Sequence, residues 1–437
     1  MDGGKELFSM EAGGKVFGFG TTDPAGLLGE EELRRIFSEI MAAYPVDGKR
    51  ILVLIPDHTR TMPLPVFYQL FYELVCEKAA RLDFLIALGT HQPMSEDAIA
   101  KVLGVTVDEL HGKYARMRVL NHEWARPETF VEIGTIAKEE LIPLTHGTID
   151  RDVKIEVNRL AMEYDRVIVL GPVFPHEVMG YSGGTKYFFP GISGADLTNA
   201  THWVAAMQTC FATIGKPDTP QRRLIERAVE RIPTERVYLC TVNRKEGVYG
   251  FFGGAPLSSW RAAVELSKQV NVVYKPRRYR LVVACMPLLY DELWTAGKGM
   301  YKLEPVVEDG GELIIYGDHI RDVSLTHDAY LNRIGYHCRD YFLSDWERWK
   351  DEPWGVIAHS THVTGLGTIE NGVEKKRIRV TLATSIPKER CESLSLGYRD
   401  PATIDVESLM GREDEGILVV PYAGETLFRL ESERGDF

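Results

Sequence analysis

The sequence predicts an α/β protein with two domains, a larger N-terminal domain built on a mostly parallel sheet and a smaller C-terminal α/β domain. Three observations support this prediction. The chain has 437 residues, short apolar runs alternate with longer amphipathic segments, and a polar, proline-containing stretch at 275–278 (KPRR) precedes a new apolar run. Apolar runs of four to six residues between helical segments are typical of strands covered on both faces.

The first domain is expected to span residues 1–272 and the second 276–412, and the apolar run 416–420 leaves open whether 413–437 rejoins the first domain. Gly18-Phe19-Gly20 lacks the third glycine of a dinucleotide fingerprint and is expected to be a turn or hairpin edge. The expected strands are 51–55, 83–88, 117–120 and 166–170, then 280–285, 312–316, 355–358 and 377–383; the expected helices are 29–43, 63–79, 95–103, 196–210 and 220–231.

Composition excludes several classes of protein. Hydrophobic residues make up 44% and charged residues 26%, as in ordinary globular proteins, and the net charge of −12 argues against a nucleic-acid-binding surface. The six cysteines form neither a C-x-x-C motif nor a disulfide pattern, which indicates reduced thiols. The sequence shows no secretory signal and no apolar stretch long enough for a membrane helix, so we expect a cytoplasmic protein without a membrane partner.

Polar, chemically capable residues follow each expected strand of the first domain. The run 51–55 leads into Asp57 and Arg60, the run 83–88 into His91, and the run 166–170 into His176. Ligands bind at the carboxyl ends of strands in open parallel sheets. We therefore expect these segments to converge on one crevice, and we place the active site in the cleft between the two domains.

The stretch 175–191 (PHEVMGYSGGTKYFFPG) contains two overlapping motifs. Ser182 fits the G-x-S-x-G pattern of serine hydrolases, but the preceding strand ends about a dozen residues earlier, so a nucleophile elbow is disfavoured. Lys186 lacks the Walker spacing, so a P-loop is also disfavoured. The glycines and hydroxyl groups favour an anion, for instance a phosphate, held by Tyr181, Ser182, Gly183 and Gly184. A purely structural glycine turn is the alternative.

Three histidines, His91, His176 and His202, stand out by their positions. Histidine titrates near neutral pH and can act as an acid or a base, and it is also a common metal ligand. These residues leave open a metal-dependent hydrolase as well as a serine hydrolase. Arg60 can bind a carboxylate with two parallel hydrogen bonds, and Asp57 could either orient Arg60 or pair with it to close the loop.

A set of spaced motifs between about residue 50 and residue 300 resembles the lactate racemase family that uses a nickel-pincer nucleotide. The central motif is long and has fixed gaps between its histidines and its lysine, which makes the resemblance specific. The matching residues are Asp57-x-Thr59-Arg60, Gly89-Thr90-His91, Pro175-His176, Gly180-Tyr181-Ser182-Gly183-Gly184-x-Lys186, Pro190-Gly191, His202 and Gly297-Lys298.

The resemblance implies a racemase or epimerase of 2-hydroxy acids whose pincer nucleotide is attached covalently to Lys186 and whose nickel is bound by His202. It implies that His91 and His176 act as an acid/base pair, that Arg60 and Lys298 hold the substrate carboxylate, and that cofactor-biosynthesis proteins mature the enzyme. It further implies that the cofactor is contacted by Asp57, Thr59, Tyr181, Ser182, Gly183 and Gly184.

The chemistry of such a reaction explains why these residue types are needed. The α-hydrogen of a 2-hydroxy acid is a poor acid, and its removal as hydride is easier when a base takes the hydroxyl proton. The hydroxyl group of either enantiomer must meet a base, so a base is needed on each side of the substrate. Thr295, with Trp294 beside it, stands where the family has a glutamine, and the shorter side chain predicts a substrate larger than lactate.

Overall fold

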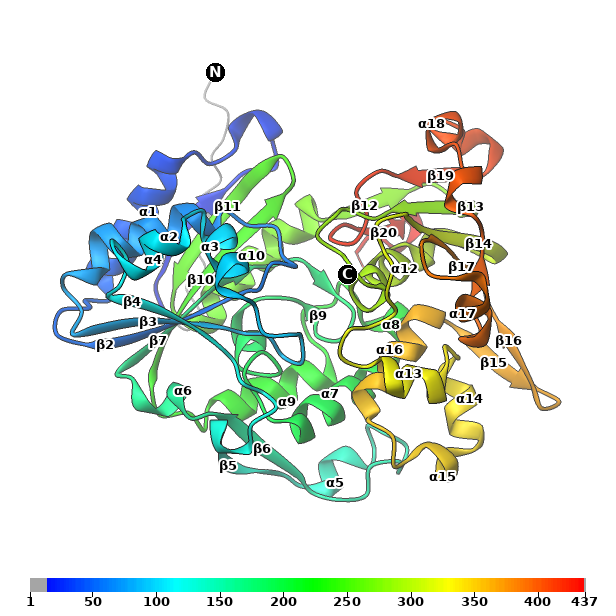
Figure 1. The fold of residues 1–437 in the computed structure, drawn as a ribbon, viewed down its shortest axis with the longest axis horizontal. Helices are drawn as coiled ribbons and strands as arrows, with labels where there is room; N and C mark the ends of the chain where they lie inside the picture. Colours follow the sequence, from blue (N-terminus) through cyan, green and yellow to red (C-terminus); the bar gives the residue numbers. More distant parts are fainter. Residues whose placement is uncertain (1–13, 436–437) are drawn as a thin grey trace.

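The computed structural model describes residues 14–435, which form two parallel-rich sheets placed side by side (Figure 1). The larger sheet has seven strands in the order β1-β11-β10-β7-β2-β3-β4. Five neighbouring strands from β10 to β4 are parallel, and β11 and β1 extend this sheet as antiparallel strands. The strands are β1 (Val16–Gly20), β2 (Arg50–Ile55), β3 (Arg81–Ile86), β4 (Met117–Asn121), β7 (Arg166–Pro172), β10 (Glu235–Arg244) and β11 (Gly247–Gly254).

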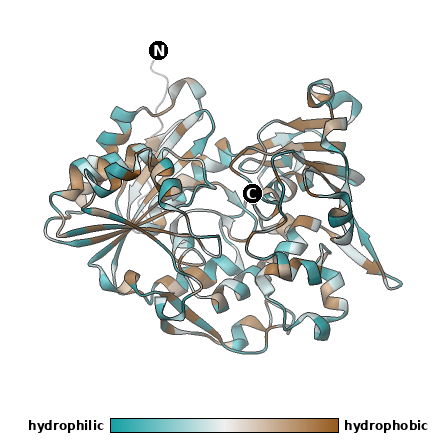
Figure 2. Cartoon of the chain, viewed as in Figure 1, coloured by the Kyte–Doolittle hydropathy of each residue, from teal (hydrophilic) through white to brown (hydrophobic). Residues whose placement is uncertain are grey.

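Helices cover both faces of this sheet. Alternate residues of β2, the middle one of the five parallel strands, point to opposite faces, and both sets are buried under helices. Ile51, Val53 and Ile55 of β2 join the core under α1 (Glu30–Ala43), α2 (Leu64–Phe71) and α3 (Glu96–Leu103). Leu52 and Leu54 join the core under α7 (Ala195–Gln208), α9 (Pro220–Val229) and α10 (Pro256–Val270). The colouring by hydropathy shows the apolar residues running along the strands between these layers (Figure 2).

The smaller sheet has five parallel strands in the order β18-β17-β14-β13-β19. Val282 and Leu313 of its central strands belong to the same continuous core as Leu52 of the first sheet. The protein thus has two halves, a larger one built on the seven-stranded sheet and a smaller one built on the five-stranded sheet. Apolar packing joins them, and in it α7 lies against α16 (Trp354–Thr364). The strands are β13 (Tyr279–Cys285), β14 (Val307–Gly317), β17 (Arg379–Thr384), β18 (Gly397–Tyr398) and β19 (Ile417–Val420).

Each sheet has a point where the strand order reverses. In the larger sheet the chain moves from β2 to β3 and β4, whereas β7 lies on the other side of β2. In the smaller sheet it moves from β13 to β14 and β17, whereas β19 lies on the other side of β13. Loops diverge at such points and leave a crevice beyond the carboxyl ends of the strands, which is where ligands bind in α/β proteins.

The fold class is confirmed, and some of the expected elements are corrected. The run 355–358, expected as a strand, lies in helix α16, because a short apolar run does not distinguish a buried strand from a buried helix. Residues 18–20 belong to edge strand β1, not to a turn. The expected helix at 63–79 ends at Phe71 and continues as a π-helical turn, Tyr72–Cys76. The hairpin β10–β11 and helix α10 had not been expected.

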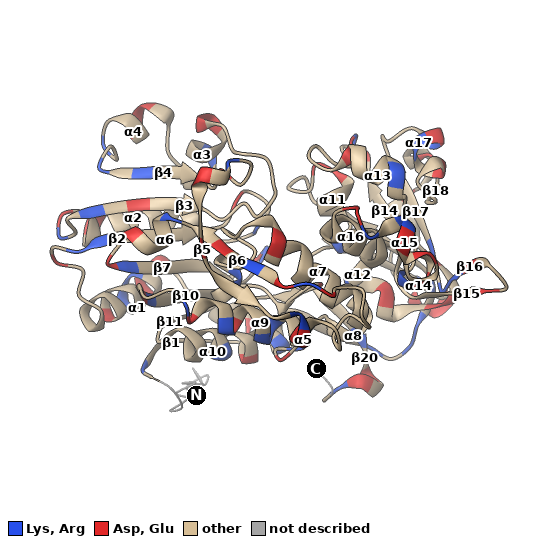
Figure 3. Ribbon diagram, turned by 90° about the horizontal axis from the view of Figure 1, so that it is seen from below, with Lys and Arg blue, Asp and Glu red and all other residues tan. Residues whose placement is uncertain are grey.

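The C-terminal segment has contacts with both halves. Strand β19 pairs with β13 of the smaller sheet, and β20 (Leu427–Leu430) pairs with β12 (Val272–Lys275). Residues 130–158 add a small two-stranded sheet, β5 (Phe130–Ile136) and β6 (Val153–Asn158), below the larger one. Acidic and basic residues are interspersed over both halves (Figure 3). In residues 14–435, no helix is long and apolar enough to cross a membrane, and all six cysteines are free thiols.

Glycine is required at position 180 by both conformation and packing. Gly180 has a φ of +72°, and a Cβ there would lie 1.8 Å from the carbonyl oxygen of Lys216. We expect Gly180→Ala to lower the free energy of unfolding by about 2–5 kcal/mol, which combines left-handed strain with overpacking. Chemical denaturation measures this change.

Gly48→Ala is the matched control, because Gly48 has a φ of +67° but no atom within 4 Å of the added Cβ. This variant should lose only the conformational part, about 1–2 kcal/mol. Equal losses in the two variants would show that the contact with Lys216 does not constrain the loop.

Candidate active site

A cavity of about 130 Å³ lies beyond the carboxyl ends of β2, β3 and β7, at the reversal point of the larger sheet. The smaller half closes it with residues of α11 (Leu293–Ala296), α12 (Lys298–Leu303) and α16. The sequence-predicted residues that line the cavity are Asp57, Arg60, His91, His176, Ser182, Gly183, Lys186, His202, Trp294, Thr295 and Lys298. The structure thus brings together residues that are far apart in the sequence.

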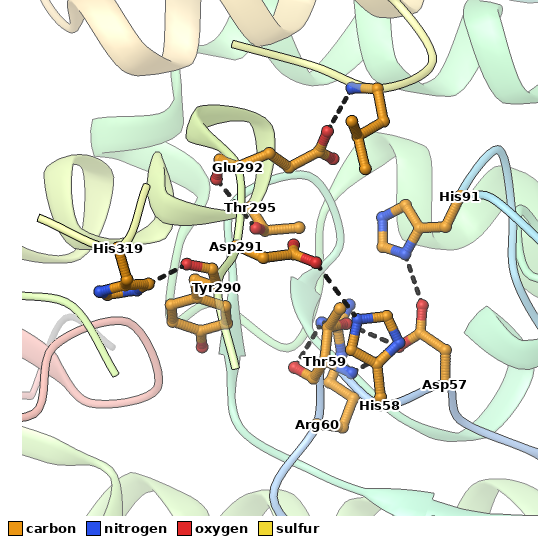
Figure 4. A network of polar contacts seen from close by, with 11 residues as sticks. Asp57, His58, Thr59, Arg60, His91, Tyr290, Asp291, Glu292, Thr295 and His319 are labelled. Atoms are coloured by element: carbon orange, nitrogen blue, oxygen red, sulfur yellow. Dashed lines mark hydrogen bonds and ion pairs between the residues drawn. The ribbon is translucent and has the colours of Figure 1, made fainter. Parts of the chain in front are cut away.

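The loop after β2 is held by a short chain of hydrogen bonds (Figure 4). The Asp57 carboxylate accepts hydrogen bonds from the backbone N–H (3.0 Å) and the hydroxyl (2.6 Å) of Thr59. The Thr59 hydroxyl oxygen in turn accepts one from the Arg60 guanidinium at 2.8 Å. Asp57 therefore orients Arg60 through Thr59 rather than by the direct pairing considered from the sequence.

The other Asp57 oxygen lies 2.5 Å from Nδ1 of His91, which follows β3. Burial alone would raise the pKa of Asp57, but His91, Arg60 and Thr59 together hold it well below its usual value. An ionised carboxylate can only accept hydrogen bonds, so Nδ1 of His91 carries the proton. With Nδ1–H held by Asp57, Nε2 is the ring nitrogen of His91 that remains for a ligand in the cavity.

His176 lies in the short strand β8 (Pro175–His176) and is almost fully buried. Its Nδ1 lies 3.1 Å from the backbone N of Val178 and 3.4 Å from that of Met179. Burial lowers the pKa of His176 well below its usual value, and the positive charges of Lys186 and Arg60 lower it further. His176 is therefore neutral in the free protein.

Lys186 lies in the 3-10 turn Gly184–Tyr187, directly after the glycine-rich segment. Burial lowers the pKa of its amine to about 7, and the nearby Arg60 charge contributes in the same direction. A lysine amine is nucleophilic only when it has lost its proton. A large fraction of Lys186 is in that form near neutral pH, which suits an amine that forms a covalent bond.

His202 lies near the middle of α7 and lines the cavity. Its Nδ1 lies 2.7 Å from the carbonyl oxygen of Thr198, one helical turn earlier, and donates a hydrogen bond to it. Burial lowers the pKa of His202 below its usual value. A neutral imidazole whose Nδ1–H is bound to a carbonyl presents Nε2 as a metal ligand.

The smaller half contributes a cation and an aromatic wall. Lys298, at the start of α12, is buried, and its ammonium lies 4.5 Å from the ring centre of Tyr290. Burial, together with the Arg60 charge, lowers the pKa of Lys298 well below its usual value. The Trp294 ring stacks on His359 with 3.9 Å between ring centres. The Thr295 hydroxyl donates a hydrogen bond to the carbonyl oxygen of Glu292 at 3.0 Å.

Several lining residues were not among those predicted from the sequence. Glu177 and Tyr301 line the cavity, as do His359 and His362 of α16. The two histidines lie three residues apart, so a helix places them on one face.

Three of the predicted cofactor contacts lie outside the cavity lining, namely Thr59, Tyr181 and Gly184. Tyr181 is completely buried, and a Cβ on Gly184 would meet the Trp260 ring. Ser182 borders the cavity, but its hydroxyl donates a hydrogen bond to the carbonyl of Pro172 (2.8 Å) and accepts one from the backbone N–H of Phe174 (3.0 Å). These contacts give Ser182 a structural role in fixing the loop.

Among residues 14–435, no group of three or more His, Cys, Asp or Glu side chains is arranged to hold a metal ion. The histidines of the cavity are instead distributed over its walls, on segments from β3, β8, α7 and α16.

The two sheets define an α/β protein, and comparisons with known proteins agree with this fold. A crystal structure of a protein from Thermotoga maritima has a TM-score of 0.85 and 32% identity, covering 92% of this chain and 99% of that one. The lactate racemase apoprotein from Thermoanaerobacterium thermosaccharolyticum has a TM-score of 0.68 at 18% identity, covering 94% of each chain, and shows the same fold.

Residues 31–213 match the family model described as the lactate racemase N-terminal domain. The chain is 25% identical over 271 residues to the lactate racemase of T. thermosaccharolyticum, covering 61% of this chain and 59% of that protein. It is 28% identical over 158 residues to that of Lactiplantibacillus plantarum, covering 36% and 33%. The matches thus span less than two thirds of either relative.

The lowered pKa of Lys186 has a measurable consequence. Cyanate carbamylates only the neutral form of an amine, so the rate at Lys186 should rise with pH and reach half its maximum near pH 7, whereas an ordinary lysine titrates near 10.4. Mass spectrometry of the peptide that contains Lys186 measures the rate.

In the Arg60→Met variant this midpoint should move to higher pH, because the Arg60 charge disfavours the protonated amine. A wild-type midpoint above pH 9 would show that the amine is not held in its neutral form.

Proposed function

We propose that this protein is an isomerase that inverts C2 of a lactate-like 2-hydroxy acid, with a nickel-pincer nucleotide as cofactor. The observation that carries the proposal is the meeting of two imidazoles, His91 and His176, with Arg60, Lys298 and Lys186 around one cavity. The match of residues 31–213 to the lactate racemase N-terminal domain, and the similarity to a lactate racemase, support the same reaction class.

Two cations from opposite halves would bind the substrate carboxylate. Arg60 belongs to the β2 loop of the larger half and Lys298 to α12 of the smaller half, and both line the cavity. The guanidinium can form two parallel hydrogen bonds with a carboxylate, and the ammonium adds a point charge. Holding the carboxylate in this way fixes the substrate while the groups on C2 change position.

The imidazoles would exchange a proton with the substrate hydroxyl. His91 is held with its Nδ1–H on Asp57, so its Nε2 can take the hydroxyl proton. The Asp57 carboxylate then stabilises the resulting imidazolium. His176, from a different strand end, would serve the opposite enantiomer. Each such group contributes roughly 10²–10⁴-fold when its pKa is near the working pH.

The residues present fit the proposed cofactor. Lys186 offers a neutral amine for covalent attachment, and His202 offers a free Nε2 for nickel, since its Nδ1–H is bound to Thr198. A site with one protein ligand agrees with the lack of a three-residue metal cluster among the described residues. When bound, the nickel-pincer nucleotide would supply an acceptor for the hydride of C2 that can return it to either face.

The aromatic wall bears on substrate size. Thr295 is short and points its hydroxyl at the carbonyl oxygen of Glu292, and Trp294 beside it offers a flat surface stacked on His359. This combination supports a 2-hydroxy acid with a side chain longer than the methyl group of lactate.

A hydrolase has less support. Both hydrogen-bonding capacities of the Ser182 hydroxyl are used within the loop, and a zinc hydrolase would need a cluster of protein ligands that residues 14–435 do not form.

An assay of chirality tests the proposal. Protein produced together with the cofactor-biosynthesis enzymes should invert C2 of at least one acid among lactate, malate, longer aliphatic, aromatic and sugar 2-hydroxy acids. His91→Gln and His176→Gln should each reduce the rate by roughly 10²–10⁴-fold. Chiral chromatography of the products measures the rate, and His111→Gln, on an exposed helix, is the control.

The proposal fails if protein carrying an adduct on Lys186 inverts none of these acids. Labelling of Ser182 by a serine-directed probe would instead favour the hydrolase.

Nickel binding tests the role of His202. We expect His202→Ala to reduce the nickel content of the loaded protein at least tenfold while the mass adduct on Lys186 persists, because the imidazole is a metal ligand and not the attachment point. Elemental analysis and intact-mass measurement separate the two effects. Unchanged nickel content in His202→Ala would assign the metal ligand to another residue.

A further inference from the structure

The surroundings of His176 contain one group that the proposed mechanism does not use. Glu177 Oε2 lies 3.5 Å from Nδ1 of His176. This oxygen is shielded from solvent and has no hydrogen-bond partner among the described residues. A buried, unpartnered carboxylate oxygen is costly, so its position calls for a physical reason.

Nδ1 of His176 therefore has two kinds of neighbour. In this structure the backbone N–H groups of Val178 and Met179 donate to Nδ1, which must be unprotonated to accept them. Glu177 Oε2 lies farther away, at 3.5 Å, and forms no hydrogen bond with Nδ1 here, but as an acceptor it would receive one from a protonated Nδ1. The neutral imidazole carries one proton, which sits on Nε2 in the first arrangement and on Nδ1 in the second.

Only the second arrangement leaves Nε2 free to accept a proton from a substrate. His91 already has that arrangement, because Asp57 holds its Nδ1–H at 2.5 Å. In the first arrangement, His176 could only donate a hydrogen bond into the cavity. The two histidines would then be unequal, and one enantiomer would lack a base.

We propose that Glu177 is a positioning residue that selects the base-competent tautomer of His176, as Asp57 does for His91. The inference rests on the proposed function, because it assigns Glu177 to the second acid/base group of that reaction. The proton passes from the substrate hydroxyl to Nε2 of His176, while the proton on Nδ1 remains hydrogen-bonded to the Glu177 carboxylate. The return of the proton reverses this step, so no other reactant is needed.

The positive charges around Glu177 keep its carboxylate ionised, so that it can accept a hydrogen bond. Burial raises its pKa, but the ammonium groups of Lys302 and Lys298 on α12, together with Lys186, hold the pKa below its usual value. The groups that face His176 are these same lysines together with Arg60 and His202. Glu177 is thus an ionised acceptor placed among cations, and it adds a negative charge beside an imidazole that must become positive during turnover.

Nuclear magnetic resonance of the cofactor-free protein tests the tautomer directly. With ¹⁵N-labelled histidine, the resonances of His176 are identified by their loss in His176→Gln. We expect the wild-type Nδ1 to show a substantial protonated population and Glu177→Met to shift it fully to the unprotonated form. Glu177→Gln keeps an acceptor oxygen and should retain part of the protonated population.

Glu374→Met is the matched control. Glu374 lies 2.8 Å from Nδ1 of His337, a second His–Glu pair outside the cavity. This variant should change the resonances of His337 and leave those of His176 as they are. A wild-type His176 with a fully unprotonated Nδ1, or a tautomer that does not respond to Glu177→Met, would overturn the proposal.

Kinetics of the loaded enzyme provide the second measurement. Glu177→Met should lower kcat roughly 10- to 100-fold with little change in KM, as for the loss of a group that orients a ligand histidine, and Glu177→Gln should lose less. Full activity in Glu177→Met would refute the assignment. If the tautomer responds to Glu177 but the loaded protein inverts no 2-hydroxy acid, the proposed function fails while the pairing with His176 stands.

Discussion

The burial of several positive charges around one small cavity is the constraint on which the site depends. Arg60, Lys186 and Lys298, drawn from both halves of the protein, line the cavity together with the carboxylates of Asp57 and Glu177, and the buried Lys302 lies nearby. Charges removed from water either lose their proton or need a partner. Here burial lowers the pKa of each lysine, which makes the amine of Lys186 reactive, while the two carboxylates stay ionised, each beside a histidine.

The topology makes this concentration of charge possible. Each sheet reverses its strand order, and the loops that open at the two reversal points face one cavity. Asp57 follows β2 and His176 follows β7 at the first point, and the Trp294–Lys298 segment follows β13 at the second. Neither sheet alone holds both cations proposed to bind a carboxylate. The site therefore exists only when the two halves are together.

Much of this arrangement could be predicted from the sequence, because its signals are local. Apolar runs identified β2, β4, β7 and β13, and polar residues after strands identified Asp57, His91 and His176. What could not be predicted depends on the fold. The run at 355–358 fits a strand or a buried helix equally well, and only its packing against α7 shows that it is helical. Glu177 looks like an ordinary charged residue until its oxygen is found buried beside His176.

The two sides of the cleft are built differently. Toward the His91 loop, the halves meet through polar contacts, Thr90 with His327 and Gln92 with Thr326. Such bonds exchange readily with bonds to water, at a net cost of about 1 kcal/mol each. On the far side, α7 and α16 share a continuous apolar core that water cannot replace cheaply. The contacts between the halves at the His91 edge therefore cost less to break than those along α7 and α16.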